Sequence, residues 1–240
     1  MLLYCTYYRP GVVYRRRWYM LGLFSFVAIL QDTVWNTWGP VEHTAKFLYG
    51  WSDELIALFA NYGSILYIVA FIPVVYLLEK SLRLSMLMTT GFMALGTILR
   101  CISLQTFQVG YIPVGLFTVS CHICSILNGI ANIVVGSAPL VLSSAWFPAE
   151  ERITATSVAQ VFNGLGTGMS FLLASQIVTP IDVYRNKTHG IPPAIVDEMK
   201  LDIQLYMYAQ AIPAGLFFIL AVIYFPSTPQ HPPSVRKTFI

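Results

Sequence analysis

Charged side chains are scarce in this sequence, because Asp, Glu, Lys and Arg together make up only 10% of its 240 residues. A soluble globular domain carries about 25% charged residues. In their place, 56% of the residues are hydrophobic, and the mean hydropathy is +0.66. This composition excludes a soluble enzyme and a disordered chain. The net charge of +3 is too small to indicate a nucleic-acid partner.

Cysteine is also rare, with four residues, Cys5, Cys101, Cys121 and Cys124. Their number and their apolar surroundings exclude a disulfide framework. Cys121 and Cys124 flank His122 in the spacing of a redox or metal motif, but the motif lies inside an apolar stretch. A redox pair needs an exposed helix N-terminus, and zinc needs further ligands. The motif is therefore predicted to serve packing and to hold no metal.

Sequence signatures of catalysis and of cofactor binding are missing. The chain has no H-E-x-x-H, G-x-S-x-G or phosphate-binding P-loop pattern. His122 is the only histidine inside an apolar run, whereas a membrane cytochrome needs paired axial ligands on facing helices. We therefore expect neither an enzyme nor a bound cofactor.

Long apolar runs dominate the chain. A helix needs about 20 apolar residues to cross the hydrocarbon of a bilayer. The sequence therefore predicts an all-α membrane protein, a six-transmembrane-helix bundle over residues 18–225. A tail at 1–17 precedes the bundle, and the proline-rich start of a linker at 226–240 follows it. The predicted spans are 18–40, 55–78, 84–104, 111–146, 153–178 and 205–225.

The fourth run is about twice the length of one span, and a turn at Asn128-Gly129 would divide it into two crossings. The distribution of Lys and Arg favours one crossing. With six spans and a cytosolic tail, nine basic residues lie on the cytosolic side and four on the far side. Cytosolic loops carry the excess of Lys and Arg. This topology also exposes Asn186, in the acceptor triplet Asn186-Lys187-Thr188, to glycosylation outside the cytosol.

Polar side chains within the first run suggest a binding surface. Asp32, Trp35, Asn36 and Gly39 follow i, i+3, i+4, i+7 spacing and are predicted to share one helix face. A carboxylate beside an indole can hold an organic cation. We predict that Trp35 and Asn36 bind substrate and that Asp32 holds the cation or a coupling proton. Alternatively, Asp32 is merely hydrated at the outer end of the helix, where we place Trp38 in an interfacial aromatic belt.

Amides in the fourth and fifth runs are further candidates for the lining of a path. Asn132 lies in the fourth run, and Gln160 and Asn163 lie in the fifth. Polar groups within a membrane helix usually face a cavity or a partner helix. We predict that all three line a substrate path, with helix–helix hydrogen bonding as the alternative.

Glycines in the same two runs predict close helix packing. Gly129 and Gly136 lie in the fourth run, and Gly164 and Gly168 have GxxxG spacing in the fifth. Small residues let membrane helices approach each other closely. These positions therefore need no ligand to explain them.

These features resemble one half of a major facilitator superfamily transporter, in which a charged turn between helices 2 and 3 latches the two halves together. Here Glu79, Lys80 and Arg83 occupy that turn, with Glu79 where the family usually has Asp. Within the superfamily, the chain resembles solute carrier family 49. The matching segments are 35–40, 95–102, 127–129, 138–139, 146–156, 224–226 and 232–235.

The resemblance implies a twelve-helix carrier of which this chain is the N-terminal half, with a C-terminal six-helix half, the lipid bilayer and a small-molecule substrate as partners. Trp35 and Asn132 align with the helix 1 aromatic and helix 4 amide that line the cavity of choline-carrying relatives. The implied cargo is a vitamin such as pyridoxine or a small organic cation, with proton coupling, in the lysosomal membrane. The alternatives are a haem or choline carrier, a plasma-membrane location, or a truncated membrane partner that does not transport.

Overall fold

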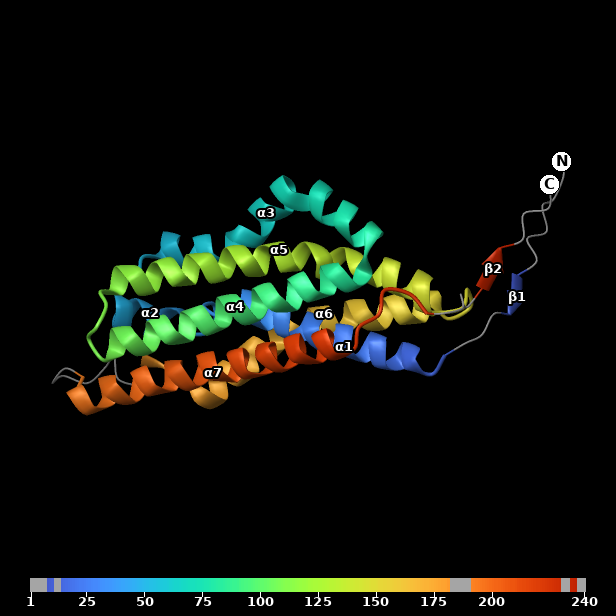
Figure 1. Ribbon diagram of the computed structural model, residues 1–240. Coiled ribbons are helices and arrows are strands. Elements are labelled where there is room, and N and C mark those ends of the chain that lie inside the picture. Colours follow the sequence, from blue (N-terminus) through green and yellow to red (C-terminus); the bar gives the residue numbers. More distant parts are fainter. Residues whose placement is uncertain (1–7, 11–13, 182–190, 230–233, 237–240) are drawn as a thin grey trace.

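The computed structural model describes residues 8–10, 14–181, 191–229 and 234–236, and Figure 1 shows long helices lying side by side. A short pair of antiparallel strands, which the sequence did not predict, lies at one end of the bundle. The all-α bundle is otherwise confirmed. The elements are β1 (Tyr8–Pro10), α1 (Arg16–Trp35), α2 (Glu42–Tyr49), α3 (Asp53–Lys80), α4 (Leu82–Gln108), α5 (Val114–Trp146), α6 (Arg152–Ile177), α7 (Pro193–Ile223) and β2 (Ser234–Arg236).

The fourth apolar run forms one helix. α5 continues through Asn128 and Gly129 without a turn and is 33 residues long. A helix of this length reaches about 50 Å, well beyond the bilayer hydrocarbon. The turn that would have given seven crossings is therefore absent from α5.

Five of the helices have the length and hydropathy of a membrane span: α1, α3, α4, α5 and α7. Within the described residues, α6 is the long helix that does not reach this hydropathy, because it carries polar residues such as Gln160, Asn163 and Thr167. α6 has 26 residues and packs along α1, so its length still fits the predicted crossing.

Two helix boundaries differ from the sequence prediction by about five residues or more, the end of α1 and the beginning of α7. α1 ends at Trp35 instead of continuing to residue 40, so Gly39 does not lie on its face. α7 begins at Pro193 rather than at residue 205, because proline at the first helical position suits a helix start. Four charged residues that precede the predicted start, Asp197, Glu198, Lys200 and Asp202, therefore lie within α7, where Lys200 pairs with Asp197 at 3.1 Å.

Pairwise contacts between the helices form one bundle. α1 packs mainly on α6, while α5 packs on α3 and α4, and α4 packs on α7. Close approach requires small residues at particular sites. A Cβ atom added to Gly129 of α5 would lie 2.7 Å from the side chain of Leu66 and 3.3 Å from the backbone of Gly63 in α3. The predicted packing role of Gly129 is thus confirmed.

The predicted contact through the GxxxG pair is wrong for this chain. Nothing among the described residues lies within 4 Å of a Cβ added at Gly164 or Gly168. The close contact belongs to Gly166, where an added Cβ would clash with the carbonyl oxygen of Ile29 and lie 2.6 Å from Cβ of Asp32. The GxxxG spacing therefore selected the wrong face of α6. The rotation of α6 about its own axis decides which glycine faces α1, and the spacing alone does not give that rotation.

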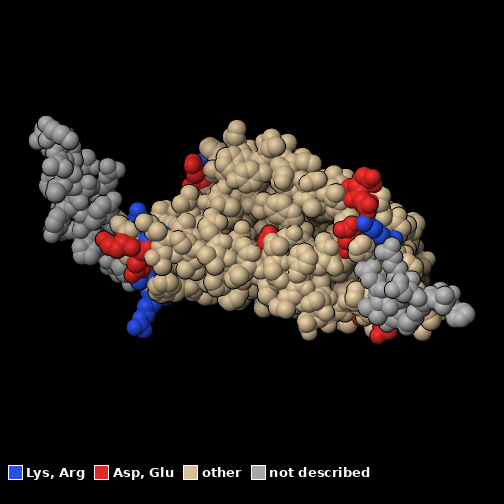
Figure 2. Space-filling model, turned by 180° about the vertical axis from the view of Figure 1, so that it is seen from behind, with Lys and Arg blue, Asp and Glu red and all other residues tan. Residues whose placement is uncertain are grey.

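Charged side chains gather at the two ends of the bundle, and Figure 2 shows one acidic patch between them on an otherwise uncharged surface. The beginning of α1 and the end of α5 meet at one of these ends, where Arg17 pairs with Glu151 at 3.0 Å. α2 lies at the opposite end, where Lys46 pairs with Glu42 and Asp53.

Candidate substrate path

The ring of Trp35 is held in place at the end of α1. Its indole nitrogen donates a hydrogen bond to the carbonyl oxygen of Ala60 in α3 at 2.9 Å. The ring lies over Gly63, where an added Cβ would be 2.7 Å from two ring carbons. Trp35 remains half-buried. The hydrogen bond and the glycine therefore fix an aromatic surface that is still partly open.

A polar cluster joins α1 to α6 beside this tryptophan. The hydroxyl of Thr167 donates to Oδ2 of Asp32 at 2.6 Å. The amide of Asn36 lies 3.5 Å from Oδ1 of Asp32 and 3.2 Å from Oγ1 of Thr167. Thr167 was not among the predicted site residues, although it follows Asn163 at i+4, the spacing that places two residues on one helix face. That spacing could have identified it.

Asp32 is a half-buried carboxylate in a membrane-spanning helix. No Lys or Arg of the described residues forms an ion pair with it. Charged groups inside membrane helices are costly, and they usually pair with one another or face a cavity. The cluster thus presents a negative charge stabilised by two neutral donors and available to a cation.

The other predicted path residues do not join this cluster. Asn163 extends its amide toward the carbonyl oxygen of Ala28 at 3.5 Å, which links α6 to α1. Gln160 is exposed and Asn132 is half-buried. Neither of these two side chains has a hydrogen-bond partner within the described residues. The structure therefore brings Asp32 and Asn36 together and leaves Gln160 and Asn132 apart from them.

A reciprocal pair of amides joins α1 to α5, and one of them belongs to Gln31, next to Asp32 in the sequence of α1. Asn128 donates to the carbonyl oxygen of Gln31 at 3.2 Å, and Gln31 reaches the carbonyl oxygen of Asn128 at 3.5 Å. Gln31 is fully buried. These amides join helices, which is the packing alternative considered for polar residues within a run.

Comparison with known proteins agrees with this architecture. The model of the Major Facilitator Superfamily matches residues 19–239. The chain belongs to this superfamily. It is 35% identical over 229 residues to a protein of Xenopus laevis named "Solute carrier family 49 member 4 homolog", covering 95% of this chain and 48% of that protein. It is 28% identical over 222 residues to the human "Choline/ethanolamine transporter FLVCR2", covering 92% of this chain and 38% of that protein.

These matches confirm the expected resemblance to solute carrier family 49. A second relative, the "Solute carrier family 49 member 4 homolog" of Xenopus tropicalis, is 35% identical over 236 residues, covering 98% of this chain and 49% of that protein. The chain thus spans about half the length of the curated relatives that it matches. Members of the superfamily are carriers rather than enzymes, in agreement with the lack of catalytic motifs.

The interfacial position predicted for Trp38 in this facilitator chain is wrong. Its side chain is 4% exposed and its ring lies 4.8 Å from that of Trp51 and 6.2 Å from that of Phe59. Because α1 ends at Trp35, the following residues turn and carry Trp38 into an aromatic core. That core includes Phe117 of α5.

A buried cation, Arg100, was missed by the sequence analysis. Its side chain is 2% exposed in α4, and it donates to Oε1 of Gln210 in α7 at 2.8 Å and to the hydroxyl of Thr37 at 3.4 Å. The guanidinium carbon lies 5.8 Å from the ring centre of Trp38. Arg100 is the charged residue within the run 84–104, and this exception should have indicated a role inside the bundle.

The motif around His122 has the packing role that was predicted. Cys121 and Cys124 are buried free thiols. The imidazole of His122 is hydrogen-bonded through Nδ1 to the hydroxyl of Tyr62 at 2.9 Å. No group of three or more His, Cys, Asp or Glu residues suited to a metal ion occurs in the described part of the chain.

The predicted latch residues flank the junction at Ser81: Glu79 and Lys80 end α3, and Arg83 is the second residue of α4. Glu79 and Lys80 are exposed, and the ammonium group of Lys80 lies 4.4 Å from the ring centre of Tyr76. The backbone N–H of Arg83 donates to the hydroxyl of Ser227 at 3.0 Å, which attaches this junction to the segment after α7.

Asn186, the predicted glycosylation site, lies outside the described residues.

α2 closes the opposite end of the bundle. Hydrogen bonds to Asp53 and Glu42 raise the pKa of the Lys46 ammonium group. Burial raises the pKa of the Tyr49 hydroxyl, whose ring lies 4.9 Å from that of Trp51. The ion pairs and the aromatic contact hold α2 against the beginning of α3.

Proposed function

We propose that this chain forms one wall of the path through which a major facilitator carrier moves a small organic solute. The cargo is a vitamin such as pyridoxine or a small organic cation. The observation that carries this proposal is the half-buried carboxylate of Asp32, which has no cationic partner among the described residues and lies on α1 one turn before Trp35.

Asp32 supplies the charge in this proposal. An organic cation is attracted by a carboxylate and by the face of an aromatic ring, and such a cation–π contact contributes about 0.5–2 kcal/mol. The donors Thr167 and Asn36 hold the carboxylate in one orientation. When the carrier is empty, a proton takes the place of the cation on Asp32, and this exchange couples the solute to protons.

Trp35 supplies the aromatic surface, and its contacts with Ala60 and Gly63 keep the ring in one orientation. Asn36 and Asn163 lie on the same α1–α6 side. Asn132 of α5 and Gln160 of α6 line the path farther from Asp32. Their amides are free to bind hydroxyl groups of a solute, because no described residue occupies them.

The opposing wall comes from a C-terminal six-helix half. Alternating access in such carriers rocks one half against the other around a midplane site. The tail 1–17, the latch formed by Glu79, Lys80 and Arg83, and the linker 226–240 lie on the cytosolic side in this proposal, and Asn186 lies outside the cytosol. The contact between Arg83 and Ser227 supports a common side for the turn and the linker.

Two relatives guide the choice of substrate and membrane. FLVCR2 is named as a transporter of choline and ethanolamine, both of which are cationic amines. The family 49 member 4 homologs are more similar to this chain. Through the resemblance to that part of the family, we assign the lysosomal membrane and pyridoxine first, with choline and the plasma membrane as the second assignment.

The test measures uptake by a full-length carrier whose first half is this chain. The Asp32→Asn variant keeps the shape of the side chain but removes its charge, and we expect uptake of radiolabelled pyridoxine or choline to fall about 10-fold or more. The matched control is Glu198→Gln, which removes the charge of an exposed acid in the first turns of α7. Equal uptake by both variants at equal membrane abundance would refute the assignment, and the substrate that is taken up decides between the two solutes.

A further inference from the structure

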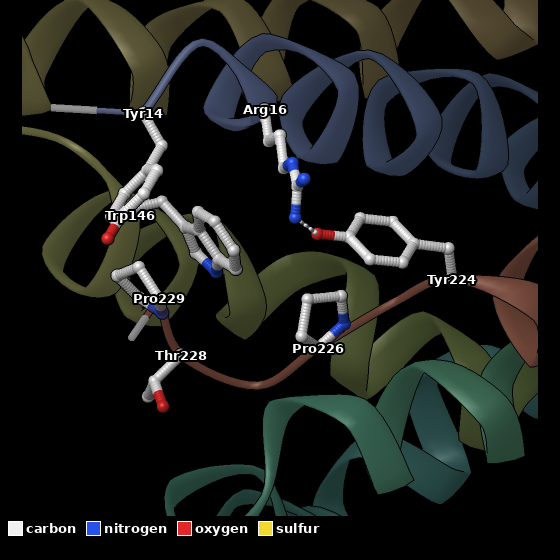
Figure 3. A pocket seen from close by; sticks show the side chains of 7 residues that line it. All are labelled: Tyr14, Arg16, Trp146, Tyr224, Pro226, Thr228 and Pro229. Carbon is white, nitrogen blue, oxygen red and sulfur yellow. Dashed lines mark hydrogen bonds between the residues drawn. The ribbon is translucent and has the colours of Figure 1, made fainter. Parts of the chain in front are cut away.

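A cavity far from Asp32 lies at the end of the bundle where α1 begins and where α5 and α7 end. Its volume is about 220 Å3. Arg16 and Asp32 lie on the same helix, and a rise of 1.5 Å per residue separates them by about 24 Å. The cavity is therefore distinct from the proposed substrate path. Seven residues line it (Figure 3): Tyr14, Arg16, Trp146, Tyr224, Pro226, Thr228 and Pro229.

Arg16 provides the positive charge of the cavity. Its Nη1 atom donates to the hydroxyl of Tyr224 at 3.0 Å, and the guanidinium carbon lies 5.7 Å from the centre of that ring. A guanidinium has five N–H donors. The tyrosine thus orients the group across the cavity (Figure 3) and uses only a part of its donor capacity.

The indole N–H of Trp146 is the second donor, and it lacks an acceptor. The side chain is 4% exposed, and Nε1 is buried with no hydrogen-bond partner among the described residues. Figure 3 shows this nitrogen facing the space that the other lining side chains surround. A buried N–H without a partner costs about 1–3 kcal/mol. An acceptor that enters the cavity would remove this cost.

Nothing in the cavity wall repels an anion. None of its seven lining residues is acidic. Glu151, which follows the end of α5, is paired with Arg17 at 3.0 Å. Arg15, exposed at the start of α1, adds a further positive charge. The ligand should therefore carry negative charge and several acceptor oxygens, which is the chemistry of a phosphate group.

We propose that this cavity binds a phosphate group, with Arg16 and the indole N–H of Trp146 as its donors. Two sources carry this chemistry, the headgroup of an acidic membrane lipid and a soluble phosphate. Basic pockets at the ends of membrane helices attract anionic lipid headgroups. The lipid is therefore the first source that we test.

Binding is measured on the purified 240-residue chain in a neutral detergent. The probes are short-chain phosphatidylinositol 4-phosphate, short-chain phosphatidylcholine and inorganic phosphate. We expect the phosphoinositide to bind and the zwitterionic lipid to bind at least about 10-fold more weakly. Trp146→Phe keeps the aromatic ring and removes the donor, so the dissociation constant for the phosphoinositide should rise about 10-fold, as should that of Arg16→Gln.

Matched variants at the same end separate a built site from general attraction. Arg15→Gln removes the same charge one residue away, and Trp18→Phe changes an exposed tryptophan that does not line the cavity. Both should bind like the unmodified chain. Tyr224→Phe frees the guanidinium from its internal acceptor and should bind at least as tightly as the unmodified chain.

Each result has a defined meaning. Inorganic phosphate that binds as tightly as the phosphoinositide, with the same sensitivity to Arg16 and Trp146, supports the soluble source. The proposal is overturned if neither phosphate probe binds, or if phosphatidylcholine binds equally well. It is also overturned if Arg15→Gln weakens binding as much as Arg16→Gln does, or if Tyr224→Phe abolishes binding. Thermal melting without ligand shows whether each variant is folded.

Discussion

Neighbouring tryptophans of the same segment have opposite roles because one lies on α1 and the other follows its end. Trp35 is half-buried, and its ring is oriented by Ala60 and Gly63. Trp38 is buried in an aromatic core with Trp51 and contacts the buried cation Arg100. At the scale of the residue, the tryptophan at position 35 therefore leaves part of its ring open, whereas the tryptophan at position 38 contributes to the packing of the core.

This difference predicts two kinds of loss in the full-length carrier. Trp35→Ala should reduce substrate affinity about 5-fold or more, because the aromatic surface is lost, while the amount of folded carrier changes little. Trp38→Ala should reduce folded carrier instead, since removing a buried aromatic side chain costs about 3–5 kcal/mol. Uptake kinetics and gel-filtration yield measure the two effects.

Conservative changes provide the control for this pair. Trp35→Phe keeps a ring and should retain most of the affinity. If Trp35→Ala and Trp38→Ala lower affinity and folded yield by the same factors, the separate roles assigned here are wrong.

At the scale of the element, the contact between α1 and α6 sets the geometry of the candidate path. Gly166 lies against the backbone at Ile29 and Thr33, and the hydroxyl of Thr33 donates to the carbonyl oxygen of Gly166 at 3.1 Å. The next residue of α6, Thr167, bonds to Asp32. Close packing at the glycine therefore brings the threonine within reach of the carboxylate.

A single methyl group at this contact should separate the two helices. Gly166→Ala places a Cβ 2.6 Å from Cβ of Asp32, and such overpacking costs about 1–3 kcal/mol. The melting temperature of the purified chain should fall by about 3 °C or more.

Gly164→Ala is the matched control on the same helix. Nothing among the described residues lies within 4 Å of its added methyl group, and alanine favours a helix over glycine by about 1 kcal/mol. Its melting temperature should stay the same or rise. A fall of equal size in both variants would contradict the assignment of the close contact to Gly166.

At the scale of the whole molecule, the bundle leaves large apolar surfaces open. Ile68 and Ile72 of α3 are 85% and 80% exposed, and they follow i, i+4 spacing on one face. A bundle within a carrier meets lipid on one side and the other half on the opposite side. This arrangement accounts for the apolar exterior of the bundle. It also accounts for the fact that the chain spans about half the length of each relative.

We expect the 240-residue chain alone to transport nothing. Alternating access needs two halves that enclose the solute, and in the proposed carrier this chain supplies only one wall. Proteoliposomes that contain the purified chain should take up pyridoxine and choline no faster than empty liposomes.

The positive control uses liposomes prepared in the same way. Liposomes containing the full-length carrier should take up the solute, and adding a C-terminal half to the chain should restore uptake. Uptake by the chain alone above the level of empty liposomes would refute the need for an opposing wall.

The sequence by itself determined the class of the protein. Membrane helices need long apolar runs, and such runs are visible without any tertiary contact, so the helices α3, α4 and α5 were predicted close to their observed bounds. The polar exceptions Asp32 and Trp35 were also visible, because polar groups stand out against an apolar background.

Only the tertiary structure decided which of these side chains meet. The partner of Asp32, the inward turn of Trp38 and the burial of Arg100 depend on where α1 ends and how α1, α4, α6 and α7 are rotated toward one another. The choice of Gly166 over the GxxxG pair depends on the same rotation. Helix periodicity places residues on a face, but packing between helices fixes which neighbour that face meets.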